Sequence, residues 1–179
     1  MFVEHYQDLL SKDKNLYFVP EFSVVTVYDD NYYLRNDYDM LSQGQRNYLI
    51  NFFKKSGLRQ KSGKLMTDDY INIHFPKPNH NLALSSYDPK YNLGPVSDVY
   101  AVTPSTFAEV IFFESLNNGI DWGVDQLKSL IQTCPYNIEL IKEINTLSPI
   151  RQLTRETQQM LSDYQARVIK EKFPRKKPL

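Results

Sequence analysis

The sequence predicts an α+β fold in which a small, mostly antiparallel sheet from the N-terminal half packs against a helical C-terminal half. Alternating β-branched and aromatic residues concentrate before residue 103, whereas apolar residues at helical spacing dominate after it. Parallel strands need a crossover between them, and only the helix predicted over 42–56 lies between predicted strands. A long amphipathic helix is expected to close the chain.

The first forty residues predict a helix followed by strand structure. Apolar side chains at helical spacing over 2–13 indicate a short amphipathic helix. Residues 16–28 are rich in valine, phenylalanine and tyrosine, and they predict one strand, or two strands broken at Pro20, where a ladder donor is missing. Residues 29–39 then predict a turn and a polar connection or edge strand.

A second helix is predicted from its start and stop signals. Ser42 is a good N-cap, and Gln45, three residues later, completes a capping box. Gly57 is the natural end of this helix. Residues 61–64 then predict a turn between strands, and the alternation over 70–75 predicts one of those strands.

The middle of the chain contains a proline-rich segment and then a buried strand. Residues 76–96 are expected to be irregular, apart from a short strand at 82–85, because proline disrupts both helices and sheets. Residues 98–102 predict a buried strand. Thr103 and Pro104 predict the start of a helix that is apolar nearly all round, which is typical of a central position in a fold.

The remainder predicts three helices. Two short ones are expected over 124–133 and 136–147. The last begins with Ser148 as its cap, and its apolar stripe over 150–168 indicates about six turns. That stripe suits packing on the chain's own core, with a homodimer seam through the 150–172 helix as the alternative.

Composition bounds the class of protein. The chain has 179 residues, 41% hydrophobic and 23% charged, which excludes disorder throughout and suits one domain over 1–166 with a basic helix end and tail over 167–179. No apolar run approaches the ~20 residues that cross a bilayer, and the start does not resemble a secretory signal. Cys134 is the only cysteine, so no internal disulfide is expected. These features predict a cytoplasmic protein without a membrane partner.

Basic residues form two groups, although the formal net charge is zero. A single acid accompanies the basic residues of the C-terminal segment, which are Arg167, Lys170, Lys172, Arg175, Lys176 and Lys177. No acid interrupts the internal group, which consists of Lys54, Lys55, Arg59, Lys61 and Lys64. Such segregation predicts contact with an acidic partner or with nucleic acid, and the alternative is a solvated hairpin tip and tail.

Tyrosines form a third candidate surface. Tyr28, Tyr32, Tyr33 and Tyr38 lie close together in the sequence, and tyrosine is enriched at binding surfaces. Four aspartates and one arginine accompany them, which disfavours contact with phosphate. We expect either a partner surface or a structural edge with aromatic packing.

A metal site is the weakest candidate. His74 and His80 flank a proline-rich bend, and Asp68 and Asp69 precede the same strand. Two histidines and a carboxylate can hold zinc or iron, and Asp98 could join them if the fold brings it near. The alternative is a partly buried His74 and a solvated His80.

Other catalytic arrangements find little support. Cys134 is expected to be a buried apolar group, and the glycine patterns of phosphate loops and nucleophile elbows are missing from the sequence. Glu109 and Glu114 lie five residues apart on the apolar helix and so do not share a face.

The predicted function is therefore a non-enzymatic cytoplasmic interaction protein, adaptor or regulatory, that binds another macromolecule, with a protein as the expected partner and no cofactor. Nucleic-acid binding through the 54–64 group and the tail is the first alternative, and a metal-dependent enzyme around His74 and His80 is the second.

Overall fold

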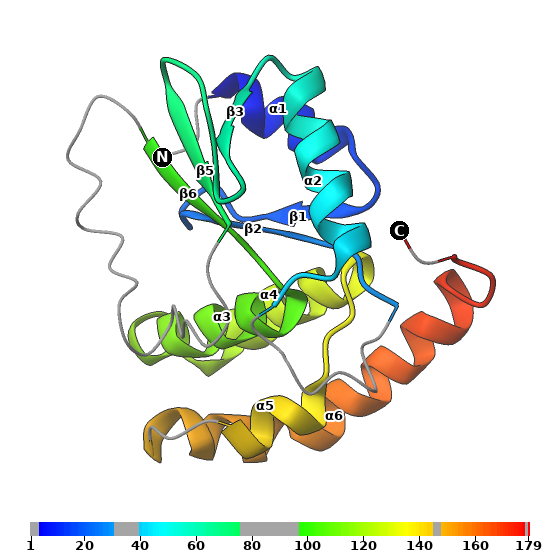
Figure 1. The fold of residues 1–179 in the computed structure, drawn as a ribbon. Coiled ribbons are helices and arrows are strands. Elements are labelled where there is room, and N and C mark those ends of the chain that lie inside the picture. Colours follow the sequence, from blue (N-terminus) through cyan, green and yellow to red (C-terminus); the bar gives the residue numbers. More distant parts are fainter. Residues whose placement is uncertain (1–3, 31–39, 76–96, 145–147, 178) are drawn as a thin grey trace.

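Helices cover both faces of one mixed sheet in the computed structural model (Figure 1). The structure describes residues 4–30, 40–75, 97–144, 148–177 and 179, with only the backbone for 142–144 and 148–149. In chain order the elements are α1 (Glu4–Lys12), β1 (Leu16–Phe18), β2 (Val24–Val27), α2 (Gln43–Lys55), β3 (Arg59–Ser62), β4 (Leu65–Thr67), β5 (Ile71–His74), β6 (Ser97–Val102), α3 (Pro104–Asn118), α4 (Ile120–Thr133), α5 (Ile138–Ile144) and α6 (Ser148–Lys172).

Local signals fix the ends of the helices. The Ser42 hydroxyl accepts a hydrogen bond from the Gln45 N–H, and the Gln45 side chain accepts one from the Ser42 N–H, which confirms the predicted capping box of α2. Gly57 follows α2 with a φ of 99°, a left-handed conformation that favours glycine. Thr103 caps α3 and Pro104 opens it, as predicted.

The sheet is mixed, so the prediction of a mostly antiparallel sheet is wrong. The strand order is β1-β2-β6-β5-β4-β3. The last strand in the sequence, β6, enters between β2 and β5 and runs parallel to both, while the other pairs are antiparallel. The prediction required a helix between successive strands, but β6 pairs with β2, from which it is separated by α2 and the β3–β5 strands.

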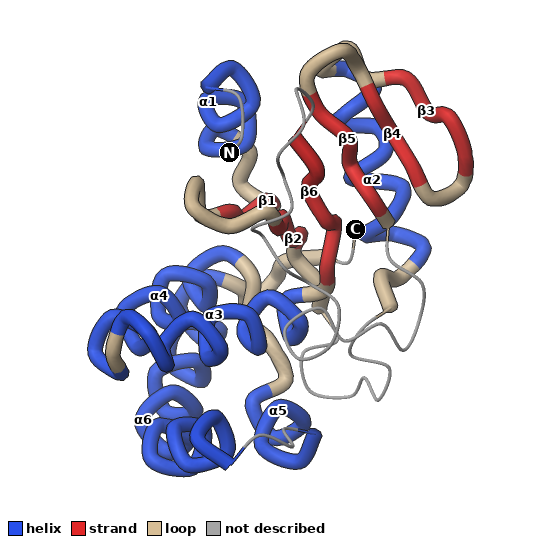
Figure 2. The backbone as a smooth tube through the Cα atoms, turned by 90° about the vertical axis from the view of Figure 1, so that its left-hand side faces the viewer, coloured by secondary structure: helices blue, strands red, loops and turns tan. Residues whose placement is uncertain are grey.

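Each face of the sheet carries its own hydrophobic core. On one face α1 and α2 bury Leu10, Leu49 and Phe53 against the valines and isoleucines of the strands. On the other face α3 packs on β2, and α4, α5 and α6 surround α3 (Figure 2). The alternation along β2 produces this division, because Val25 contacts the first core and Val24 the second.

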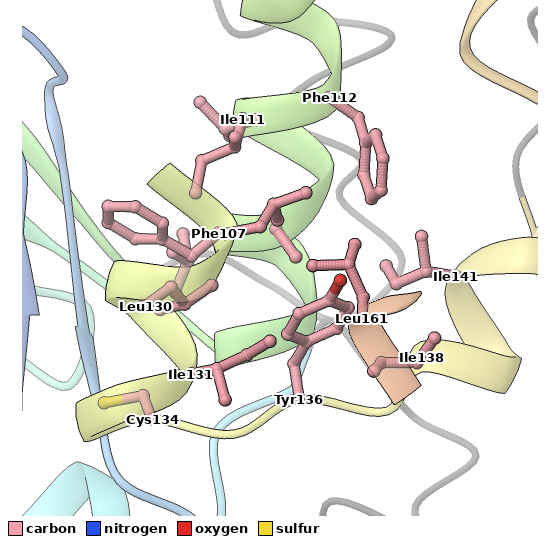
Figure 3. Packing of buried hydrophobic residues seen from close by; sticks show 14 of the residues in the cluster. Phe107, Ile111, Phe112, Leu130, Ile131, Cys134, Tyr136, Ile138, Ile141 and Leu161 are labelled. Atoms are coloured by element: carbon pink, nitrogen blue, oxygen red, sulfur yellow. The ribbon is translucent and has the colours of Figure 1, made fainter. Parts of the chain in front are cut away.

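Helix α3 is the centre of the second core. Phe107, Ile111 and Phe112 are at most 2% exposed, which agrees with the expectation of a central helix. Tyr136 approaches them from the segment between α4 and α5, and its hydroxyl lies among carbon side chains (Figure 3). Its backbone N–H donates to the Gln165 side-chain oxygen and its C=O accepts from the Gln165 side-chain nitrogen, so α6 helps to fix its position.

The apolar stripe of α6 packs within the chain. Its buried residues, with Leu161 at 1% exposed, belong to the second core, and α6 contacts α3, α4 and α5. Ile150, Leu161 and Val168 of this stripe are therefore covered within the chain, whereas Met160 is exposed. The helix also continues across residue 167 to Lys172, so the first basic residues of the C-terminal segment are helical.

Candidate functional site

The internal basic group forms one edge of the sheet. Lys54 and Lys55 end α2, Arg59 and Lys61 lie on β3, and Lys64 lies in the turn to β4. All five side chains are exposed, and none forms an ion pair with a described residue. Strand β3 is the outermost strand, and every one of its residues is exposed. We call this surface the basic edge.

Arg46 is a further cation at the basic edge that the sequence analysis missed. Its guanidinium lies over the Phe75 ring, 4.9 Å from the centroid. It also lies 3.6 Å from where a Cβ on Gly63 would be, so it touches the β3–β4 turn. Arg46 lies on α2, two turns before Lys54, and the packing of α2 beside the β3–β4 turn brings its guanidinium to this surface.

The C-terminal tail folds back on the body of the protein. Phe173 stacks on Tyr28 with ring centroids 5.4 Å apart, and the Lys176 ammonium lies 3.8 Å from the centroid of the same ring. Partial burial, with Lys14 nearby, lowers the pKa of Lys176. The terminal Leu179 contacts Gly44 at the start of α2.

The tail residues therefore do not act as one exposed group. Arg167, Lys170, Arg175 and Lys177 are exposed, whereas Lys176 is half-buried on Tyr28. The tail and the β3–β4 turn nevertheless both contact the first turns of α2. The tail does so through Leu179 at Gly44, and the turn through Gly63 at Arg46.

The predicted tyrosine surface is tested at one position only. Tyr28 is 1% exposed and is covered by the chain's own tail, so it packs structurally and presents no partner surface. Tyr32, Tyr33 and Tyr38 lie outside the described residues.

A second cluster occupies the face of β4, β5 and β6 opposite α2. The His74 ring nitrogen Nε2 lies 2.7 Å from Asp98 Oδ1, which also accepts a hydrogen bond of 3.0 Å from Asn72. Thr67 donates to the Asn72 amide oxygen at 2.7 Å, and the His74 ring stacks on Tyr100. No described helix lies over this part of the sheet (Figure 2).

Electrostatics favour an ionised Asp98. Partial burial alone would raise the pKa of Asp98, but the hydrogen bonds from His74 and Asn72 outweigh burial and lower it. Partial burial and the charge of Asp98 raise the pKa of Tyr100. The carboxylate holds the imidazole in place, as in a His–Asp pair, but no serine, cysteine or lysine among the described residues bonds to His74. The pair can contact a ligand, and it lacks a nucleophile in the part of the chain that the structure describes.

The metal residues do not converge. Asp68 is engaged in the β4–β5 turn, where Tyr6 donates to one carboxylate oxygen and two backbone N–H groups donate to the other. The described ranges contain no group of three histidine, cysteine, aspartate or glutamate side chains placed to hold a metal, and His80 lies outside them. Asp69 is exposed beside the turn. Of the candidates only His74 and Asp98 meet.

Cys134 fits the expectation of a buried apolar group. It is fully buried in the second core, and burial raises the pKa of its thiol. Its sulfur lies 3.6 Å from the Asn15 carbonyl oxygen, so the thiol donates a weak hydrogen bond to the backbone within the core.

Comparisons with known proteins do not identify the chain. No family model, curated protein or solved structure matches it. Among the described residues no helix is both long enough and apolar enough to span a bilayer.

Proposed function

We propose that the protein is a non-enzymatic interaction protein of the cytoplasm, adaptor or regulatory, that binds an acidic segment of another protein at the basic edge. The observation that carries this proposal is the set of exposed cations along β3 and the end of α2, none of which forms an ion pair with a described residue, although the charge of Arg59 acts on Asp68. Like charges repel one another within roughly the Debye length, which is about 8 Å at physiological salt. An acidic partner relieves that repulsion, which supplies a driving force for binding.

The strand itself supports a protein partner. Because β3 is the last strand of the sheet, one side of its backbone faces away from β4, and an extended segment can pair there. A bulge between Gln60 and Ser62 interrupts the pairing with β4 and leaves Lys61 at the irregularity. Binding of an acidic strand would place carboxylates beside Arg59 and Lys61.

Nucleic acid is the less favoured partner. Single-stranded nucleic acid is usually bound by basic residues interleaved with aromatic residues on which bases stack. Residues 54–64 contain no aromatic residue, and the chain as a whole has no net positive charge.

The test compares two polyanions. A glutamate-rich peptide and a short DNA duplex, both fluorescently labelled, are titrated with the full chain at low and moderate salt. We expect the peptide to bind more tightly than the duplex, and to bind more tightly at low salt than at moderate salt. Lys61→Glu should weaken binding of the peptide by about fivefold. Arg155→Glu, the same charge change at an exposed position on α6, serves as the control and should leave binding nearly unchanged.

Two outcomes contradict the proposal. Equal weakening by both variants would show a response to net charge alone. Tighter binding of the duplex, lost in Lys61→Glu, would replace the protein partner by nucleic acid.

A further inference from the structure

A recess of about 300 Å³ lies far from the basic edge, where the β1–β2 turn meets the end of α3 and the start of α4. Its walls include Val19, Phe22, Trp122, Glu21, Glu114 and Gln126. Glu109, on another face of α3, is buried in the core, as the spacing of the two glutamates predicted. The recess has both apolar and acidic walls.

Two aromatic rings form the apolar wall. Phe22 and Trp122 meet edge to face, with centroids 6.1 Å apart and ring planes at 74°. Phe22 is buried and also packs against Phe107 of α3, which fixes its ring in place. The face of an indole carries negative electrostatic potential and attracts cations more strongly than other aromatic rings do.

Two carboxylates complete the recess. Glu21 is exposed on the β1–β2 turn, and Glu114 is half-buried on α3. Neither carboxylate forms an ion pair or hydrogen bond with a described residue, although the backbone carbonyl of Glu114 accepts a hydrogen bond from the Asn118 side chain. Burial raises the pKa of Glu114. The recess therefore combines aromatic surface with uncompensated negative charge.

We infer that this recess binds an organic cation of the alkylammonium class, with its apolar substituents against Phe22 and Trp122 and its charge beside Glu21 and Glu114. The cation is either a free small molecule or the side chain of a methylated lysine in a peptide, since both present the same group. This site is independent of the proposed function, because it adjoins β1–β2 whereas the basic edge adjoins β3 at the other end of the sheet.

Trp122 is the only tryptophan of the chain, so its fluorescence reports on this recess directly. The full chain is titrated with choline and, separately, with 3,3-dimethyl-1-butanol, a neutral molecule of the same shape. We expect a saturable change with choline in the millimolar range and at least tenfold weaker binding of the neutral analogue. A linear response to choline, or equal affinity for both molecules, would overturn the inference.

A matched pair of variants tests the carboxylate. Glu114→Gln should weaken choline at least threefold, while Glu4→Gln, which removes one negative charge from exposed α1, should not change affinity. If both variants weaken choline binding equally, the binding depends on net charge alone and the proposed site is wrong. Circular dichroism checks that Glu114→Gln is folded, and Glu21→Gln repeats the test on the exposed turn.

A trimethyl-lysine peptide distinguishes the two sources of the cation. Tighter binding of this peptide than of choline assigns the recess to a protein side chain, and equal affinity assigns it to a free cation. Both results support the inference. It is contradicted if Glu114→Gln leaves the affinities for the unmethylated and the trimethylated peptide unchanged.

Discussion

At the scale of single residues, the Tyr136 hydroxyl stands out in the second core. It is buried and has no hydrogen-bond partner among the described residues, although the backbone of the same residue is bonded twice to Gln165. Burial raises its pKa, so the hydroxyl is neutral at any ordinary pH. A buried hydroxyl that has lost its water contacts without replacement destabilises the folded state.

Replacing Tyr136 by phenylalanine should therefore stabilise the protein. Removing the hydroxyl is expected to raise the free energy of unfolding by about 1 kcal/mol, because the ring stays in place and the desolvation cost disappears. Urea denaturation measures the change. The control is Tyr6→Phe, which removes a hydroxyl that does donate to Asp68 and should lower stability by about as much. A destabilised Tyr136→Phe protein would mean that the hydroxyl has a partner.

At the level of secondary-structure elements, two neighbouring residues of α6 test whether this terminal helix is part of the second core. Leu161 is 1% exposed in the second core, while its neighbour Met160 is 40% exposed. The two residues have similar side-chain size and adjacent positions, so they separate packing from helix propensity.

Truncating each of the two to alanine gives the corresponding prediction. Leu161→Ala should lower the free energy of unfolding by about 2–5 kcal/mol, because it leaves a cavity. Met160→Ala should stay within about 0.5 kcal/mol of the wild type. Both are measured by chemical denaturation at several protein concentrations. A Leu161→Ala effect that shrinks as the protein is diluted would instead indicate that the stripe forms a dimer seam.

At the scale of the whole molecule, two carboxylates join elements that are distant in the sequence. Asp68 connects the β4–β5 turn to α1 through Tyr6, and Asp98 connects β6 to β5 through His74 and Asn72. Partial burial works against both charges, yet the hydrogen bonds lower both pKa values. A folded pKa below the unfolded value of about 3.9 stabilises the fold above that pH, and the stabilisation disappears as pH falls through the folded pKa.

Acid should therefore weaken the fold partly through these two groups. We expect the free energy of unfolding to fall between about pH 5 and pH 2, and Asp68→Asn or Asp98→Asn to reduce that slope. Asp69→Asn, at an exposed carboxylate that makes none of these bonds, is the control and should keep the full slope. Urea midpoints across the pH range provide the measurement. Unchanged slopes in both test variants would contradict the assignment.

Charge on the folded molecule is also divided between the two ends of the sheet. The unpaired cations lie on the β3 edge, and the acidic recess lies beside the β1–β2 turn. The sequence predicted the cations as a group, because all five lie within the short segment 54–64. It did not predict the recess, because Glu21, Glu114 and Trp122 come from three separate segments.

Short-range interactions explain what the sequence determined by itself. The ends of α2 and α3, the break at Pro20 and the β3–β4 turn depend on residues within a few positions of one another, so their patterns are legible without a structure. Tertiary structure alone decided the position of β6 between β2 and β5 and, with it, the meeting of Asp98 and His74 across 24 residues. The choice of strand neighbour depends on how both cores pack at once, and no local pattern encodes it.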